Sequence, residues 1–366
     1  MALLDCLICC LGVIDLGDFE AMESFLKSFL PLLMSPGVPG REGDVTKWLY
    51  GRVKPHADEI HVDALGNLIA VKEGRSDGHL MLVAHTDELG LVVSNILDEG
   101  LLKFKKLGGI DDRVLASRHV IVHGMKGPCE GVIGWTPPHL VIEPDEMKKV
   151  VGWQDLFIDV GAESADEAFE MGIRIGDPIT FKKQLSVLNN KLVASRAMDD
   201  RVGCWILMKF MERVGSVKAK ISAVFSSQEE IGFRGATTAA FAQDPSFAVA
   251  VDTGSASGFP MAPQALGSFR VGRGPVLRIV DSRMVVSVKA KDFIVKVAEK
   301  GKIPYQLGVT GGSTDVAAVQ LARKGVMVCP ICIPLKYSHS FGEVASLADI
   351  ENTLSLLLQV AEEYRI

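Results

Sequence analysis

Two glutamates, Glu229 and Glu230, stand side by side in the stretch AVFSSQEEIGFRGA, directly after an apolar run. Adjacent side chains in extended or irregular backbone point in different directions, so one carboxylate can bind a metal ion while its neighbour faces a substrate. Such a pair suits hydrolysis by a metal-activated water, with Glu230 as a metal ligand and Glu229 as the general base. Because two adjacent glutamates are most often a solvated charge pair, the assignment depends on further ligands elsewhere in the chain.

Further metal-binding side chains follow other apolar runs. The run Leu80–Ala84 leads into His85, the stretch FAVAVDTG contains Asp252, and the run Val326–Ile333 is followed by His339. Histidine and carboxylate side chains are the ligands that Zn, Co and Mn take in proteins. A site with two metal ions needs about five or six protein ligands, one of them a bridging carboxylate. The candidates reach that number: His85, Asp199 or Asp200, Glu230, Asp252 and His339.

The elements that carry these residues predict that they converge. Short unbroken apolar runs alternating with helical patterns predict an α/β fold, with a mostly parallel central sheet flanked by helices. Helices are expected over Asp199–Gly215 and Ser313–Gly325, each with a polar start and a glycine stop. Sites in such sheets lie at the carboxyl ends of the strands, so ligands distant in sequence can meet in space.

The segment between residues 90 and 190 has a different pattern, with short alternating runs separated by Gly, Pro and Asp. This pattern predicts a small β-rich, barrel-like insertion at 90–190 within an α/β domain made of residues 1–89 and 191–366. His119 and His123 share one face of a predicted strand there, which does not by itself make a second metal site. The sequence IDDRVL at Asp111–Arg113 echoes MDDRVG at Asp199–Arg201, but we expect its aspartates to serve a turn.

Composition limits the classes of function. The 366 residues are 48% hydrophobic and 23% charged with a formal net charge of -6, which favours a globular chain and argues against binding to nucleic acid or acidic lipid. A small-molecule or peptide substrate is expected.

The cysteines and the N-terminus bear on where the protein resides. Seven cysteines, an odd number, indicate a reducing compartment and thus a cytoplasmic protein, and the pair in CPIC is read as part of a buried strand. The apolar N-terminus lacks a basic start and is too short for a membrane span, so we interpret it as a packed or poorly ordered leader before Met22.

Six stretches occur in the order and approximate spacing of one known family: AHTDELG, AMDDRVGC, SSQEEIGFRGA, AVDTG, GGSTD and YSHSFGE. From about Leu30 onward the chain resembles the tetrahedral and glutamyl aminopeptidases, metallopeptidases with two metal ions that have also been labelled cellulase M or endoglucanase. The resemblance implies a zinc-aminopeptidase-like catalytic domain.

The resemblance also implies roles. His85 and Asp252 would hold one divalent ion (Zn, Co or Mn), Glu230 and His339 a second, and Asp199 would bridge both. Glu229 would be the base and Asp87 would orient the His85 imidazole. A loop on the substrate side would comprise four further residues: Gly311, Gly312, Thr314 and Asp315.

The function implied by the resemblance is removal of N-terminal residues from short peptides. The insertion would form dimers that assemble into a hollow tetrahedral dodecamer. A carboxypeptidase or a deacylase with the same metal chemistry is the alternative. A glycoside hydrolase is less favoured, because it needs two carboxyl groups flanking the bond and no metal. A non-catalytic binding protein is disfavoured because every expected ligand position holds a competent residue.

Overall fold

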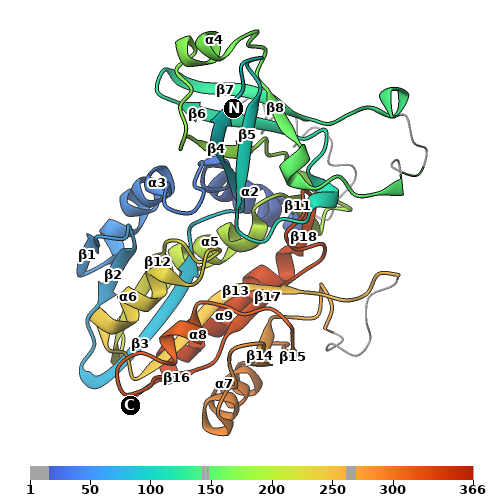
Figure 1. The fold of residues 1–366 in the computed structure, drawn as a ribbon. Coiled ribbons are helices and arrows are strands. Elements are labelled where there is room, and N and C mark those ends of the chain that lie inside the picture. Colours follow the sequence, from blue (N-terminus) through green and yellow to red (C-terminus); the bar gives the residue numbers. More distant parts are fainter. Residues whose placement is uncertain (1–15, 142–144, 146–147, 261–268, 366) are drawn as a thin grey trace.

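The structure is a computed structural model that describes residues 16–141, 145, 148–260 and 269–365. In this part of the chain a nine-stranded mixed sheet forms the centre of the molecule (Figure 1). The strands follow one another across the sheet in this order: β1 (Glu59–Val62), β2 (Leu68–Lys72), β12 (Ala219–Ser226), β3 (Ser76–His85), β13 (Phe247–Ser255), β17 (Ile331–Leu335), β14 (Val276–Val280) and β15 (Gln306–Val309), with β16 (Met327–Val328) beside β13. The four middle strands, β12, β3, β13 and β17, are parallel.

Helices flank the sheet, and the strands that they cover consist mainly of buried apolar residues. β13 is buried from Phe247 to Gly254, as expected for a parallel strand covered on both faces. The helices form two groups: α2 (Leu16–Met34), α3 (Gly43–Val53), α5 (Met198–Arg213), α7 (Val288–Gly301) and α9 (Leu347–Glu363) in one, and α6 (Arg234–Gln243) with α8 (Val316–Val319) in the other. Trp205 of α5 packs edge-on against Phe25 of α2 and donates a hydrogen bond to Ser28 Oγ (2.9 Å), which fixes these two helices together.

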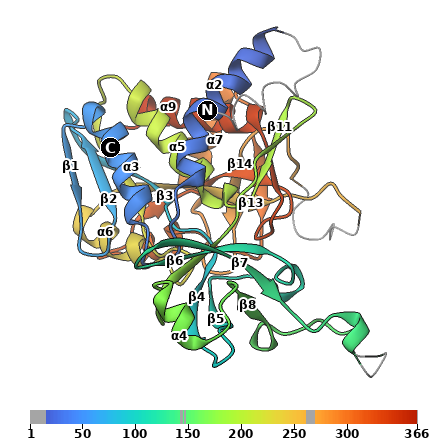
Figure 2. The same cartoon turned by 90° about the horizontal axis from the view of Figure 1, so that it is seen from above.

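A closed six-stranded barrel interrupts the α/β part between β3 and α5 and lies at one end of the molecule (Figures 1 and 2). Its strands are β4 (Gly90–Ile96), β5 (Leu102–Leu107), β6 (His119–Gly124), β7 (Gly127–Gly134), β8 (Phe157–Asp159) and β9 (Pro178–Phe181), accompanied by α4 (Ala165–Glu170). The barrel has its own apolar core, which includes Val93, Phe104 and Ile158. The fold class expected from the sequence, an α/β protein interrupted by a barrel-like insertion, is therefore confirmed.

A small antiparallel sheet connects the barrel to the α/β part. It contains β10 (Ser186–Leu188), β11 (Leu192–Ser195) and β18 (Glu343–Ser346). β11 leads directly into α5, and β18 follows the loop that carries His339. Single-turn helices complete the described elements: η1 (Lys54–His56), η2 (Asp112–Val114), η3 (Pro138–Leu140) and η5 (Trp153–Asp155).

Two predicted elements differ from the structure. The helix expected over Ser313–Gly325 is wrong in length, because α8 ends at Val319 and turns follow, with Arg323 and Gly325 at positive φ. The strand expected over Val326–Ile333 is split into β16 and β17 around Pro330, which has no N–H to donate to a neighbouring strand.

Other expectations from the sequence have mixed outcomes. Cys329 and Cys332 are buried free thiols, as expected. The proposed leader lies largely in residues 1–15, outside the described residues, and Met22 is buried inside α2. Among the described residues, no helix combines the length and apolarity that a membrane span requires.

Candidate metal centre

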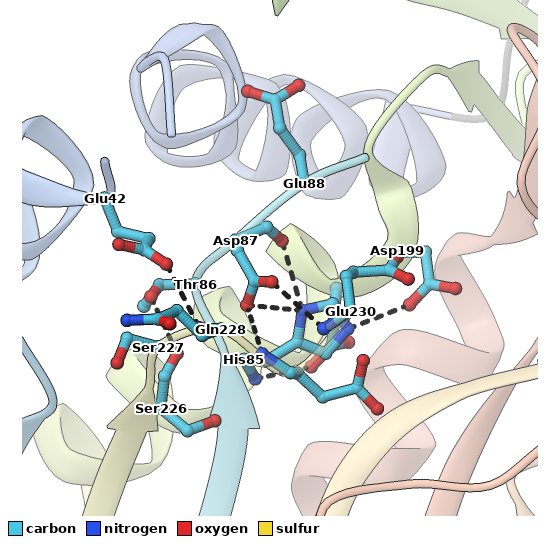
Figure 3. A network of polar contacts seen from close by, with 12 residues as sticks. Glu42, His85, Thr86, Asp87, Glu88, Asp199, Ser226, Ser227, Gln228 and Glu230 are labelled. Atoms are coloured by element: carbon cyan, nitrogen blue, oxygen red, sulfur yellow. Dashed lines mark hydrogen bonds and ion pairs between the residues drawn. The ribbon is translucent and has the colours of Figure 1, made fainter. Parts of the chain in front are cut away.

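The carboxyl ends of the middle strands open into a cavity of about 560 Å³. His85 is the last residue of β3, Glu229 and Glu230 follow β12, Asp252 lies near the end of β13, and Asp199 and His339 come from the start of α5 and the loop after β17. All six side chains line the cavity, so the structure brings together every predicted ligand and the predicted base. Figure 3 shows His85, Asp199 and Glu230 close to one another.

The donor atoms form three overlapping groups among the described residues, each with its atoms within 4.8 Å of one another. These groups are His85 with Asp199 and Asp252, His85 with Glu229 and Glu230, and Asp199 with Glu230 and His339. The Asp199 carboxylate is shared by two of them: its Oδ1 lies 3.3 Å from His85 Nε2 and its Oδ2 lies 3.5 Å from His339 Nε2. Its two oxygens thus face different histidines, which is the geometry that a bridging ligand needs.

Both histidines are oriented through Nδ1. His85 Nδ1 donates to the main-chain oxygen of Asp87 (3.1 Å), and His339 Nδ1 donates to the main-chain oxygen of Gly109 (3.0 Å). With the proton on Nδ1, Nε2 of each neutral ring keeps its lone pair, which can coordinate a metal ion in the cavity. Gly109 belongs to the barrel segment, and its contribution could not be read from the sequence because a main-chain oxygen leaves no signal in residue type.

Asp87 has a wider role than the one expected from the sequence. Its Oδ1 lies 3.5 Å from His85 Nδ1, and its two carboxylate oxygens accept hydrogen bonds from the main-chain N–H groups of Glu229 (2.9 Å) and Glu230 (3.1 Å). One buried carboxylate therefore ties the end of β3 to the loop that carries both glutamates (Figure 3).

The cavity concentrates negative charge away from water. Burial raises the pKa of Glu230 to about 7 and that of Asp252 to about 6. Burial also raises the pKa of Glu229 well above its ordinary value. Asp199 differs: burial opposes its ionisation, but its contacts with the His339 and His85 imidazoles lower its pKa below the ordinary value. Four carboxyl groups and two imidazoles form a donor set that transition-metal ions accept.

Asp199 and Asp200 occupy different surroundings, although a cis peptide bond joins them. Asp200 is fully buried, does not line the cavity, and accepts hydrogen bonds from the main-chain N–H groups of His85 (3.3 Å) and Gly203 (3.1 Å). Of the two, Asp199 is therefore the one that can reach a metal ion.

The rival aspartate and histidine motifs lie in the barrel segment. Asp111 accepts from the main-chain N–H of Arg113 (2.9 Å) at the start of η2, which is the turn role expected for it. His123 pairs with Thr180 Oγ1 (2.8 Å), and neither His123 nor His119 belongs to a candidate metal group of the described residues.

Only one of the four residues predicted for the substrate-side loop lines the cavity. Gly312 lines the cavity, whereas Gly311 is exposed and outside the lining, and Thr314 and Asp315 are buried and likewise outside it. Asp315 instead accepts a short hydrogen bond from Ser226 Oγ behind the site, and burial raises its pKa to about 7.

Two further candidate residues, Arg278 and Glu343, were not predicted from the sequence. Arg278 of β14 lines the cavity, is only 5% exposed, and donates from Nη2 to the main-chain oxygen of Thr253 (2.7 Å). Its Nε and Nη1 have no hydrogen-bond partner within the described residues. Glu343 is buried and accepts from the main-chain N–H groups of His339 (2.8 Å) and Asp199 (3.3 Å). An arginine inside the apolar run VLRIV was the available signal for Arg278.

The chain is similar over most of its length to characterised proteins and solved structures. The profile of the M42 glutamyl aminopeptidase family matches residues 66–356. A lysyl aminopeptidase of Pyrococcus furiosus is 33% identical over 353 residues, covering 95% of this chain and 98% of the relative.

Two solved structures extend this similarity to the fold. The Pyrococcus horikoshii TET1 peptidase, which can assemble into a tetrahedron or a large octahedral shell, is 38% identical with a TM-score of 0.85, covering 93% of this chain and 100% of that one. A Thermotoga maritima structure described as an endoglucanase is 31% identical with a TM-score of 0.75, covering 92% and 96%. The match of the family profile, together with these similarities, shows that the chain is a peptide hydrolase and belongs to the M42 glutamyl aminopeptidase family.

Proposed function

We propose that the chain is an aminopeptidase that uses two divalent metal ions, Zn, Co or Mn, in the cavity at the carboxyl end of its sheet. His85 and Asp252 would hold one ion, Glu230 and His339 the other, and Asp199 would bridge them. The observation that carries the proposal is that the two oxygens of Asp199 face Nε2 of different histidines, with Glu229 beside them.

The chemistry follows from what the side chains can do. Bound divalent ions lower the pKa of a water molecule and polarise the scissile carbonyl. Glu229 would take the proton of the attacking water and deliver it to the leaving amine, as a general base that then acts as a general acid. Asp87 holds the main-chain N–H groups on which the directions of Glu229 and Glu230 depend.

Arg278 supports a preference for an acidic N-terminal residue. Arg278 lines the cavity and is 5% exposed, and its Nε and Nη1 have no hydrogen-bond partner among the described residues but are themselves buried, so a substrate carboxylate would reach them with a small shift of the side chain. A second arginine, Arg283, is exposed on the same cavity. A planar guanidinium binds a carboxylate through two parallel hydrogen bonds, and a buried one does so with little screening. The substrate class that fits is a short peptide beginning with Glu or Asp.

The proposal also covers the assembly of the protomers and the cellular location of the protein. We infer a catalytic domain of residues 1–89 and 191–366 and an insertion of residues 90–190 through which protomers pair, building a tetrahedral dodecamer. The shells formed by the similar TET1 peptidase support this assembly. A cytoplasmic location is supported by four free cysteines among the described residues: Cys129, Cys204, Cys329 and Cys332.

The test is hydrolysis of aminoacyl p-nitroanilides and N-acetylated peptides by chelated enzyme, before and after Zn, Co or Mn is added back. We expect cleavage only of substrates with a free amine, only after metal is restored, and with two ions bound per chain by elemental analysis. Cleavage of blocked peptides would favour the carboxypeptidase or deacylase alternative. Chelator-resistant cleavage of a glucan would favour the glycosidase.

A further inference from the structure

The loop between β12 and α6 carries both adjacent glutamates, and side chains from outside the loop hold it. Four consecutive main-chain N–H groups each donate to a side-chain oxygen: Ser227 to Asn67 Oδ1 (2.9 Å), Gln228 to Glu42 Oε1 (3.0 Å), Glu229 to Asp87 Oδ1 (2.9 Å) and Glu230 to Asp87 Oδ2 (3.1 Å). Figure 3 shows Glu42 and Asp87 reaching this loop.

The N–H groups of this loop need such acceptors because the loop lies outside regular secondary structure. Strand pairing of β12 ends at Ser226 and α6 begins only at Arg234, so neither ladder nor helix satisfies the intervening N–H groups. Gln228 also has φ +56°, a left-handed conformation that residues with a side chain rarely adopt. The main-chain oxygens of Ser227, Gln228 and Glu229 accept from N–H groups at 232–235, so the external acceptors supply what this turn lacks: partners for the N–H groups at 227–230.

Glu42 is the acceptor furthest from the chemistry. It lies just before α3, is 5% exposed, and does not line the catalytic cavity. Its Oε1 accepts from the main-chain N–H of Gly40 (2.8 Å) as well as from Gln228, so one oxygen joins the segment before α3 to the loop. Asn67 is itself fixed by donating from Nδ2 to Asp63 Oδ2 (2.7 Å). Two of the acceptors that hold the loop are thus tied by further hydrogen bonds to neighbouring segments.

We propose that Glu42 is a positioning residue for catalysis, which binds neither metal nor substrate but fixes the Gln228 amide and through it the direction of the Glu229 carboxylate. The inference rests on the role proposed above for Glu229. It predicts that the Oε1 acceptor matters and that the charge of Glu42 does not. Burial, reinforced by the charge of Asp87, raises the pKa of Glu42 to about 7, so an uncharged side chain suits this place.

The experiment compares Glu42→Gln, which keeps the acceptor, with Glu42→Leu, which removes it at similar size, in the full metal-loaded chain. We expect Glu42→Leu to lower kcat by about tenfold to a hundredfold with KM and metal content unchanged, since displacement of a catalytic group by about 1 Å has an effect of this order. Glu42→Gln should stay within about twofold of the unaltered enzyme. Asp44→Leu is the matched control, because Asp44 is an exposed acid in the first turn of the same helix.

Hydrogen exchange followed by mass spectrometry supplies a readout that needs no activity. Glu42→Leu should speed exchange of the amides at 227–230 while α3 and β12 keep their protection. Glu42→Ala is the second variant if the leucine protein does not fold. The inference is overturned if exchange at 227–230 is unchanged, if Glu42→Gln loses as much kcat as Glu42→Leu, or if protection is lost throughout the domain. Because exchange does not depend on Glu229 as base, a failure of the proposed function is recognised separately.

Discussion

Replacing Arg278 by glutamine should convert a preference for acidic substrates into a preference for neutral ones. The guanidinium lines the cavity, is 5% exposed and has two buried nitrogens without a partner, so a substrate carboxylate that reaches it would form a buried, hydrogen-bonded charge pair. Glutamine is shorter and uncharged, so the change removes the guanidinium charge together with the hydrogen bond from Arg278 Nη2 to the main-chain oxygen of Thr253 (2.7 Å).

The magnitude follows from the burial of this arginine. Removing one partner of a buried charge pair costs about 2 to 5 kcal/mol, and every 1.36 kcal/mol is about a tenfold change in rate. We therefore expect kcat/KM for glutamyl p-nitroanilide to fall by roughly 30-fold to several thousandfold. For leucyl p-nitroanilide, which brings no carboxylate, we expect a change of less than about fivefold.

Arg283 provides the matched control, because it lines the same cavity but is exposed. An exposed ion pair contributes about 0.2 to 1 kcal/mol, so Arg283→Gln should lower glutamyl turnover by no more than about fivefold. Metal content must be measured alongside, since Asp252 lies close enough to Arg278 to raise its pKa. Equal losses for glutamyl and leucyl substrates at full metal occupancy would refute the reasoning and leave Arg278 as a structural counter-charge.

The remaining predictions concern the base, the bridging ligand and a histidine outside the site. Glu229→Gln should keep both ions yet lose about 10²- to 10⁴-fold in kcat, and full activity would show that another group moves the proton. Asp199→Ala should lose metal, measured by elemental analysis, whereas Asp111→Ala, a change at the exposed turn, should keep it. Burial lowers the pKa of His79 to about 4, so His79 stays neutral in the folded chain while the unfolded chain takes up a proton below pH 6.5. Stability should therefore fall as the pH drops from 6.5 toward 4, and His79→Gln should reduce that fall by about 1 to 2 kcal/mol at pH 5 in chemical denaturation; an unchanged pH profile would contradict this.

The sequence predicted the parts of the site that depend on residue type and on strand ends. His85, Glu230 and Asp252 follow or end apolar runs, and a mostly parallel sheet brings such positions to one edge. The choice of Asp199 over Asp200 came only from the resemblance, and the structure supplies the physical difference between a side chain in the cavity and one buried beneath it.

What the sequence could not predict depends on main-chain direction. Whether Thr314 and Asp315 line the cavity or lie behind it is decided by a turn whose shape no residue type specifies. Pro330 could have indicated the break between β16 and β17, but the apolar run around it concealed that signal. The support of the Glu229 loop by Glu42 links residues that are 186 positions apart, a contact that no local pattern reveals.

The hydrogen bond from His339 Nδ1 to the main-chain oxygen of Gly109 joins the barrel segment to the metal centre. We therefore expect that the barrel cannot be removed or exchanged without disturbing the metal centre. A chain without it would leave this imidazole free to rotate and to change tautomer, and we expect its second metal position to weaken first. Substitutions that tilt the barrel should thus alter metal retention without touching a single ligand. Selection for metal affinity can in this way act on residues far from the ions.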